Sequence, residues 1–120
     1  MIPLLQNQPL PELMPVGSIE NLGSTVLEGN PEASIAMLHG APTDALTCGI
    51  FSCTKGRFEM VYPFTEHATV LEGQVELINK STGDTQVFSA GDSWFVEQGT
   101  NVEWNIQSDR FVKHYLGSAS

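Results

Sequence analysis

The stretch from Gly56 to Gly99 constrains the fold of this chain more than any other part of it. It consists of short runs of alternating apolar and polar residues, such as 74–77, and each run ends at a glycine or another turn-forming residue. Alternation with a period of two is typical of β-strands that bury one face. Nowhere do apolar residues recur at helical spacing over three turns. The sequence therefore predicts an all-β domain, a sandwich or barrel of many short strands.

The other strand-like segments lie on both sides of this stretch. The expected strands are 25–27, 35–38, 46–53, 58–62, 66–71, 75–77, 87–88, 93–97, 101–106 and 110–116. Turns are expected at 63–65, 81–84 and 90–92, where Pro, Gly, Asp and Ser gather. There is no internal repeat, so the pattern indicates one domain.

Residues 1–16 form a segment of different character, with four of the seven prolines of the chain. Proline at this density disfavours a helix and favours an extended arm. The arm is also apolar, so we expect it to lie on its own domain or on a partner subunit. The chain thus divides into an arm, 1–16, and a β-barrel domain, 17–120, and the arm favours a homodimer.

Charge and composition exclude several classes of function. The chain of 120 residues has 14 acidic and 5 basic residues, a net charge of −9, which repels nucleic acids and anionic membranes. No apolar run is long enough to span a bilayer. No basic residue precedes Lys55, so no signal or transit peptide is expected. The sequence predicts a cytoplasmic protein that binds neither nucleic acid nor membrane.

Five short motifs occur in an order that points to a known family. They are Tyr62-Pro63 with Glu66, the segment 70–77 (VLEGQVEL), Ala90-Gly91-Asp92, Gly99 with Trp104, and the segment 112–115 (VKHY). From about Cys48 to Gly117 the chain resembles a cupin, a double-stranded β-helix or jelly-roll barrel. It is most similar to the small cupins grouped with the ureidoglycine aminohydrolase cupin domain and an ethanolamine-utilisation cupin.

The resemblance also locates the positions that hold metal in cupins. Met60 and Tyr62 fall where the cupin motif has two histidines, and Val102 falls where it has a third, so only Glu66 remains. A divalent metal needs three or four N, O or S donors. We therefore expect no cofactor and no usual cupin metal site. The alternative is Mn, Fe, Ni or Zn held by Glu66 with His67, although neighbouring residues of a strand face opposite ways.

A buried ion pair is the second expectation for the barrel interior. Lys113 lies in a mostly apolar strand, and an ammonium that faces inward needs a partner, for which Glu66 is the natural candidate. The same lysine could instead belong to a structural pair or extend to the surface. Together these arguments give a set of candidate ligand-binding residues. The set is Glu66, Lys113, Tyr62, Met60 and Trp104.

Three functions follow from these observations. The first is a small cupin that binds a small polar metabolite without metal. The second is a metal-dependent enzyme resembling the ureidoglycine aminohydrolases, which acts on an amine- or ureide-containing compound. The third is a structural or regulatory dimer module whose barrel is filled by its own side chains. The sequence leaves open whether the protein is an enzyme, and it does not name the metabolite.

Overall fold

Two long antiparallel strands, β4 (Leu46–Val61) and β9 (Asn101–Ser118), organise the fold of the computed structural model, which describes residues 1–120. They pair along their whole length, from Leu46 opposite Ser118 to Val61 opposite Asn101. The sequence suggested two short strands in place of each. The structure corrects this, because a β-bulge between Thr54 and Gly56 lets the pair bend without ending.

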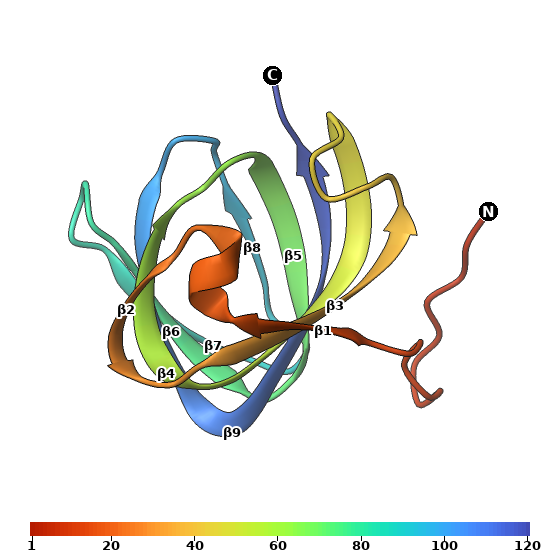
Figure 1. The fold of residues 1–120 in the computed structure, drawn as a ribbon, viewed down its shortest axis with the longest axis horizontal. Coiled ribbons are helices and arrows are strands. Elements are labelled where there is room, and N and C mark those ends of the chain that lie inside the picture. Colours follow the sequence, from red (N-terminus) through yellow and green to blue (C-terminus); the bar gives the residue numbers. More distant parts are fainter.

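Seven shorter strands and one turn of 3₁₀ helix complete the domain (Figure 1). They are β1 (Met14–Ser18), η1 (Ile19–Leu22), β2 (Thr25–Gly29), β3 (Glu32–His39), β5 (Thr65–Glu72), β6 (Gln74–Asn79), β7 (Thr85–Ser89) and β8 (Ser93–Val96). The predicted all-β class and the cupin fold are confirmed.

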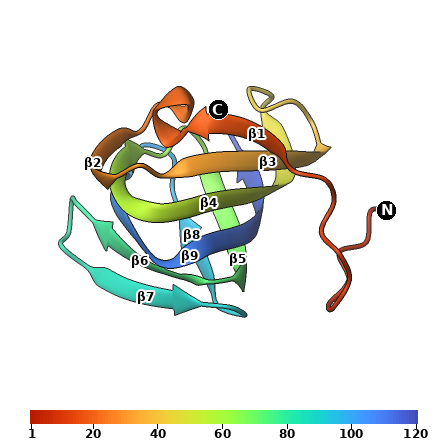
Figure 2. The ribbon, with the colours of Figure 1, turned by 60° about the horizontal axis from the view of Figure 1, so that its bottom comes forward.

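The bend divides β4 and β9 into halves that belong to two different parts of the sheet. One half of the pair continues the strand order β1-β3-β4-β9-β5-β8. The other half pairs with β2 on the β4 side and with β6, followed by β7, on the β9 side. Figures 1 and 2 show how the two parts curve around a common interior. Side chains from both parts therefore meet inside.

Aromatic side chains fill most of this interior. They come from β4, β8 and β9 and from the turn after β4, and they pack edge-to-face or stacked with ring centroids about 5–6 Å apart. The buried aromatic residues are Phe58, Tyr62, Trp94, Trp104, Phe111 and Tyr115.

Gly73 sets the sharp turn that takes the chain from β5 to β6. Its φ is 87°, in the left-handed region, and an added Cβ would collide with the carbonyl oxygen of Arg110. Only glycine fits both the conformation and the close approach to β9. The turn places β5 and β6 against opposite halves of β9, which is how the two parts of the sheet share one interior.

The N-terminal residues before β1 project from the body of the domain (Figures 1 and 2). Their apolar side chains are largely exposed, for example Ile2 at 56% and Leu5 at 67%. β1 begins at Met14 and pairs with β3 at one edge of the sheet, so the end of the predicted arm segment is a strand. The structure contains no helix with the length and apolar character needed to cross a membrane.

Candidate functional site

The interior contains one buried ion pair, and strand alternation places both of its members there. On β5, Glu66 is fully buried whereas the next residue, His67, is exposed. On β9, Lys113 lies between the outward-facing positions 112 and 114 and is 5% exposed. β5 and β9 are neighbours, and the long lysine side chain spans the offset between the two residues.

The pair belongs to a closed set of hydrogen bonds. Lys113 Nζ donates to Glu66 Oε1 at 2.5 Å. The other carboxylate oxygen, Oε2, accepts from the Tyr62 hydroxyl at 2.7 Å and from Trp94 Nε1 at 3.0 Å. The expected contact between Glu66 and Lys113 is thus present. Both oxygens of the carboxylate have partners, as a buried charge requires.

The Lys113 ammonium is also enclosed by aromatic rings. Five ring centroids lie between 4.9 and 5.9 Å from Nζ, within the range of cation–π attraction. These rings belong to Phe51, Tyr62, Trp94, Trp104 and Tyr115. The side chain of Lys113 therefore occupies an aromatic box of its own protein.

Burial changes the proton affinities of this group of residues. It lowers the pKa of Lys113, and the charge of Glu66 and its hydrogen bond oppose that shift by favouring the ammonium. Burial, followed by the charge of Glu66, raises the pKa of Tyr62 well above its usual range. Tyr62 therefore keeps its proton and remains a hydrogen-bond donor to Glu66.

A cavity of about 470 Å³ opens beside this group, between β8 and the hairpin formed by β6 and β7. Tyr62 and Trp94 line it, and they separate it from Glu66 and Lys113, which do not. Its apolar lining is completed by Leu77, Phe88, Phe95, Val96 and Val102, and its polar lining by Asn79, Asp84, Thr85, Gln86 and Thr100. The size and mixed lining suit a small ligand.

The residues predicted from sequence for ligand binding are distributed over three places. Tyr62 lies in the wall of the cavity, and Glu66 and Lys113 lie behind that wall. Trp104 is 1% exposed in the core under the ammonium, and its Nε1 has no hydrogen-bond partner. Met60 is half-buried opposite Val102 and packs against the core.

Sequence reasoning missed the polar residues that β6, β7 and their turn contribute to the cavity. Residues 81–84 were recognisable as a hairpin turn, and a hairpin presents the ends of its strands together. Nothing local indicated that this hairpin would lie against β8, because that contact depends on how β5 and β6 pair with opposite halves of β9.

The residues of the interior do not fit the metal that cupins commonly hold. Nowhere in the structure do three or more His, Cys, Asp or Glu side chains come together as a group that could bind an ion. His67 lies on the opposite face of β5 from Glu66, so the two side chains do not converge. Within the interior, a lysine ammonium instead stands beside the one carboxylate.

Comparison with known proteins establishes the family. The sequence profile of the EutQ-like cupin domain matches residues 40–115, so the chain belongs to that family. No curated protein matches the sequence.

Solved structures share the fold at low sequence identity. A putative ethanolamine utilization protein, EutQ, from Salmonella typhimurium is 19% identical with a TM-score of 0.60, over 72% of this chain and 69% of that one. EutQ of Clostridium difficile is 18% identical with a TM-score of 0.62, over 74% and 69%. A protein of unknown function from Pseudomonas syringae, of the DUF861 family, is 21% identical with a TM-score of 0.76, over 91% and 45%.

The ion pair makes a prediction about stability. Lys113→Met leaves a buried carboxylate without its cation, and we expect a loss of about 3–5 kcal/mol in the free energy of unfolding, the range for a broken buried pair. The double variant Glu66→Gln with Lys113→Met should recover much of this loss, because it removes both charges. Denaturant unfolding of the wild type, both single variants and the double variant measures the coupling. Additive effects would show that the two residues do not interact.

Proposed function

We propose that this protein binds a small polar metabolite in the cavity beside Tyr62 and Trp94, without a divalent metal. The observation that carries the proposal is the cavity itself, about 470 Å³ with five polar side chains in a partly aromatic wall. Its inner wall is fixed, because Tyr62 and Trp94 both donate hydrogen bonds to the buried Glu66. A rigid wall lowers the ordering cost of binding.

In this proposal the buried ion pair supports the wall and does not touch the ligand. Glu66 uses both carboxylate oxygens within the protein, and Lys113 is enclosed by rings. The ligand meets the outer surfaces of Tyr62 and Trp94 together with the polar groups of β6 and β7. The earlier set of binding residues is thus refined to an inner, supporting group and an outer, contacting group.

The two alternatives receive less support from the geometry. A metal-dependent enzyme resembling the ureidoglycine aminohydrolases needs a donor set that the interior does not supply. A dimer module with a filled barrel agrees with the packed interior, but it gives no role to the cavity beside it.

The proposal predicts ligand-induced stabilisation that depends on the cavity. In a thermal-shift screen of amines, amino acids, amides and small carboxylic acids, we expect at least one compound to raise the melting temperature. At a ligand concentration of about one hundred times Kd, binding should stabilise the folded state by about 2.7 kcal/mol. Thr85→Trp, which fills the cavity from its exposed edge, should abolish the shift. Thr25→Trp, on exposed β2, is the control and should retain it. Equal shifts in both variants would place binding elsewhere.

The proposal also predicts the metal content. Protein purified without chelators should contain well under about one equivalent of Mn, Fe, Ni or Zn, because three converging donors are missing. Elemental analysis of the wild type measures this. One equivalent of metal that is lost in Glu66→Gln would support the enzyme alternative instead.

A further inference from the structure

The charges around the cavity are of one sign. Asp84 is its single charged lining residue, and the Asp84 carboxylate makes no ion pair or side-chain hydrogen bond in the structure. Lys80 follows the lining residue Asn79, but its ammonium lies between Glu59 and Glu103. No Lys, Arg or His lines the cavity.

The buried charges of Lys113 and Glu66, behind the wall of the cavity, do not change the net negative charge at the cavity. Lys113 and Glu66 form a neutral pair, so no net charge from the interior reaches the cavity. The nearest uncompensated charge is therefore the negative charge of Asp84. The aromatic side chains in the wall of the cavity also favour a cationic ligand, because the faces of aromatic rings attract cations.

We propose that the ligand is a small organic cation, an ammonium group on a compact apolar body. This inference rests on the proposed function and specifies its ligand class. Asp84 and the rings of Trp94 and Phe88 would face the ammonium group and the apolar body attached to it, and the amides of Asn79 and Gln86 would supply hydrogen bonds. A net charge of −9 on the chain favours the approach of a cation further.

A matched pair of probes tests the charge preference. Choline and its neutral isostere, in which a quaternary carbon replaces the nitrogen, have the same shape. We expect choline to bind about ten-fold more tightly by calorimetry, as cation–π and ionic attraction predict. Asp84→Asn should reduce the preference to about two-fold or less. Asp109→Asn, an exposed carboxylate outside the cavity, is the control and should leave it unchanged.

The outcomes separate this inference from the proposed function. If the isostere binds as tightly as choline, the cavity is a binding site but the preference for cations is wrong. If neither probe nor any compound of the thermal-shift screen binds, both proposals fail. If Asp109→Asn lowers the preference as much as Asp84→Asn, the effect comes from net charge and not from the cavity.

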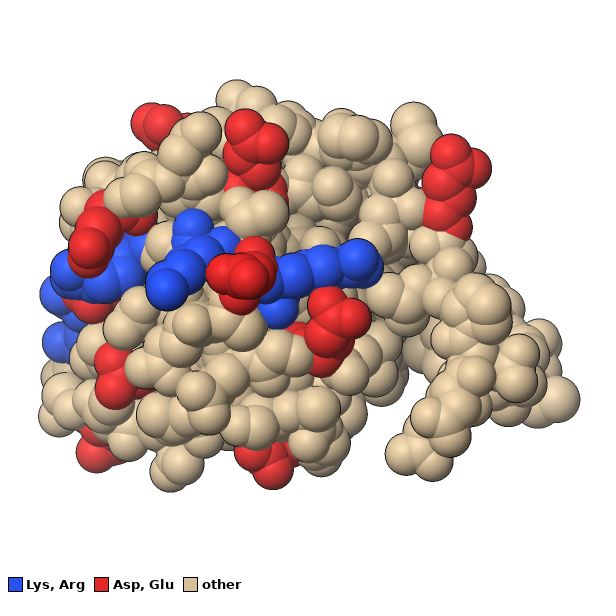
Figure 3. Space-filling view, turned by 90° about the horizontal axis from the view of Figure 1, so that it is seen from below, with Lys and Arg blue, Asp and Glu red and all other residues tan.

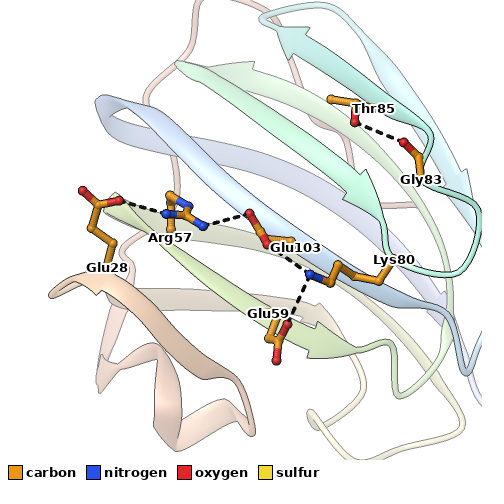
Figure 4. Close-up of polar contacts among 7 residues, drawn as sticks. All are labelled: Glu28, Arg57, Glu59, Lys80, Gly83, Thr85 and Glu103. Atoms are coloured by element: carbon orange, nitrogen blue, oxygen red, sulfur yellow. Dashed lines mark hydrogen bonds and ion pairs between the residues drawn. The ribbon is translucent and has the colours of Figure 1, made fainter.

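An independent observation concerns the outer faces of β4 and β9, which differ between the two halves of the strands. The half that pairs with β2 and β6 carries a chain of ion pairs (Figure 4): Arg57 contacts Glu28 and Glu103 at 3.1 and 3.2 Å, and Lys80 contacts Glu103 and Glu59 at 3.4 and 3.9 Å. Figure 3 shows basic side chains in a band with acidic ones between them. A surface of exposed charged side chains is well solvated by water.

The other half has one ion pair close to the bulge, between Arg110 and Glu72 at 3.4 Å, and its outer face beyond that pair has no Lys, Arg, Asp or Glu. Alternation turns the positions next to the buried residues outward, and the register aligns them in two rows across β4, β9, β5 and β8. The rows are Cys48, Leu116, His67, Phe95 and Ile50, His114, Thr69, Ser93. None is Lys, Arg, Asp or Glu, in a chain with 14 acidic and 5 basic residues. We call these eight residues the uncharged face.

The uncharged face combines exposed apolar side chains with neutral polar ones, and it adjoins the N-terminal arm. Leu116 is 49% exposed and Phe95 is 66% exposed, and neighbouring Leu46 is 49% exposed. At its border Leu13, the last residue before β1, packs against the outer cluster that includes Ile50. The remainder of the arm leaves the body from there (Figure 2), and most of its apolar side chains are exposed.

We infer that the uncharged face binds a second copy of this chain, with each arm lying on its partner. Two copies with a net charge of −9 each repel one another unless they meet where charge is absent, and the uncharged face meets this condition. The same chain supplies an apolar arm, at the border of that face, that its own body does not cover. Symmetric pairing covers both features at once.

Analytical ultracentrifugation of the full chain tests this inference. The wild type should be dimeric at about 10 µM, and higher salt should tighten the dimer, because salt screens the repulsion between acidic copies. Leu116→Asp and Leu46→Asp should each weaken association about ten-fold or more, since a buried unpaired carboxylate is costly. Val61→Asp, at an apolar position that is 61% exposed on the charged half of β4, is the control. Deletion of residues 1–13 should also weaken association.

Two results would overturn the inference. One is a wild type that stays monomeric at about 500 µM, which would leave the face to a different partner. The other is an equal effect of Val61→Asp and Leu116→Asp on association, which would place the interface elsewhere. Circular dichroism and melting temperature confirm that each variant is folded before its association is compared.

Discussion

The ion pair between Glu66 and Lys113 is the interaction on which the interior depends. A carboxylate with no solvent exposure needs a counter-charge and hydrogen-bond donors, and the fold supplies both within the protein. Tyr62 and Trp94 donate to one oxygen and the lysine to the other. These contacts fix the orientation of the aromatic side chains, which in turn shape the cavity. The buried ion pair therefore has a structural role, and through Tyr62 and Trp94 it supports the wall of the cavity.

The aromatic box explains why a lysine is stable at this position. The ammonium loses its water on burial, which lowers its pKa, but Glu66 and five ring faces replace part of that solvation. In a cupin with a metal, a divalent cation balances the carboxylate of the first motif. In this protein the ammonium group of Lys113 lies beside the Glu66 carboxylate instead. Met60 and Val102, at positions where the cupin motif has histidines, are accordingly apolar packing residues.

The two halves of the long strand pair formed by β4 and β9 have different outer surfaces. Because each strand bends and continues, one half of the pair exposes a chain of ion pairs, and the other exposes the uncharged face beyond the single pair of Arg110 and Glu72. The cavity lies at the open side of β8 and the β6–β7 hairpin, whereas the arm leaves from β1 at the opposite edge of the sheet. The proposed ligand site and the proposed interface between copies thus meet at Phe95 of β8 and extend from it in different directions, the site toward β6 and β7 and the interface toward β4.

The sequence by itself determined the strand content and the resemblance to cupins, and it identified Glu66 and Lys113 as candidates for a buried pair, whose contact the structure then showed. Period-two alternation fixes which residues face inward, and a buried charge in an apolar strand demands its opposite. Only the tertiary structure decided that β4 and β9 are continuous, because a bulge is visible only against a paired strand. It also decided that Asp84 and Gln86 line a cavity with Trp94. These residues meet through non-local strand pairing, which local patterns do not encode.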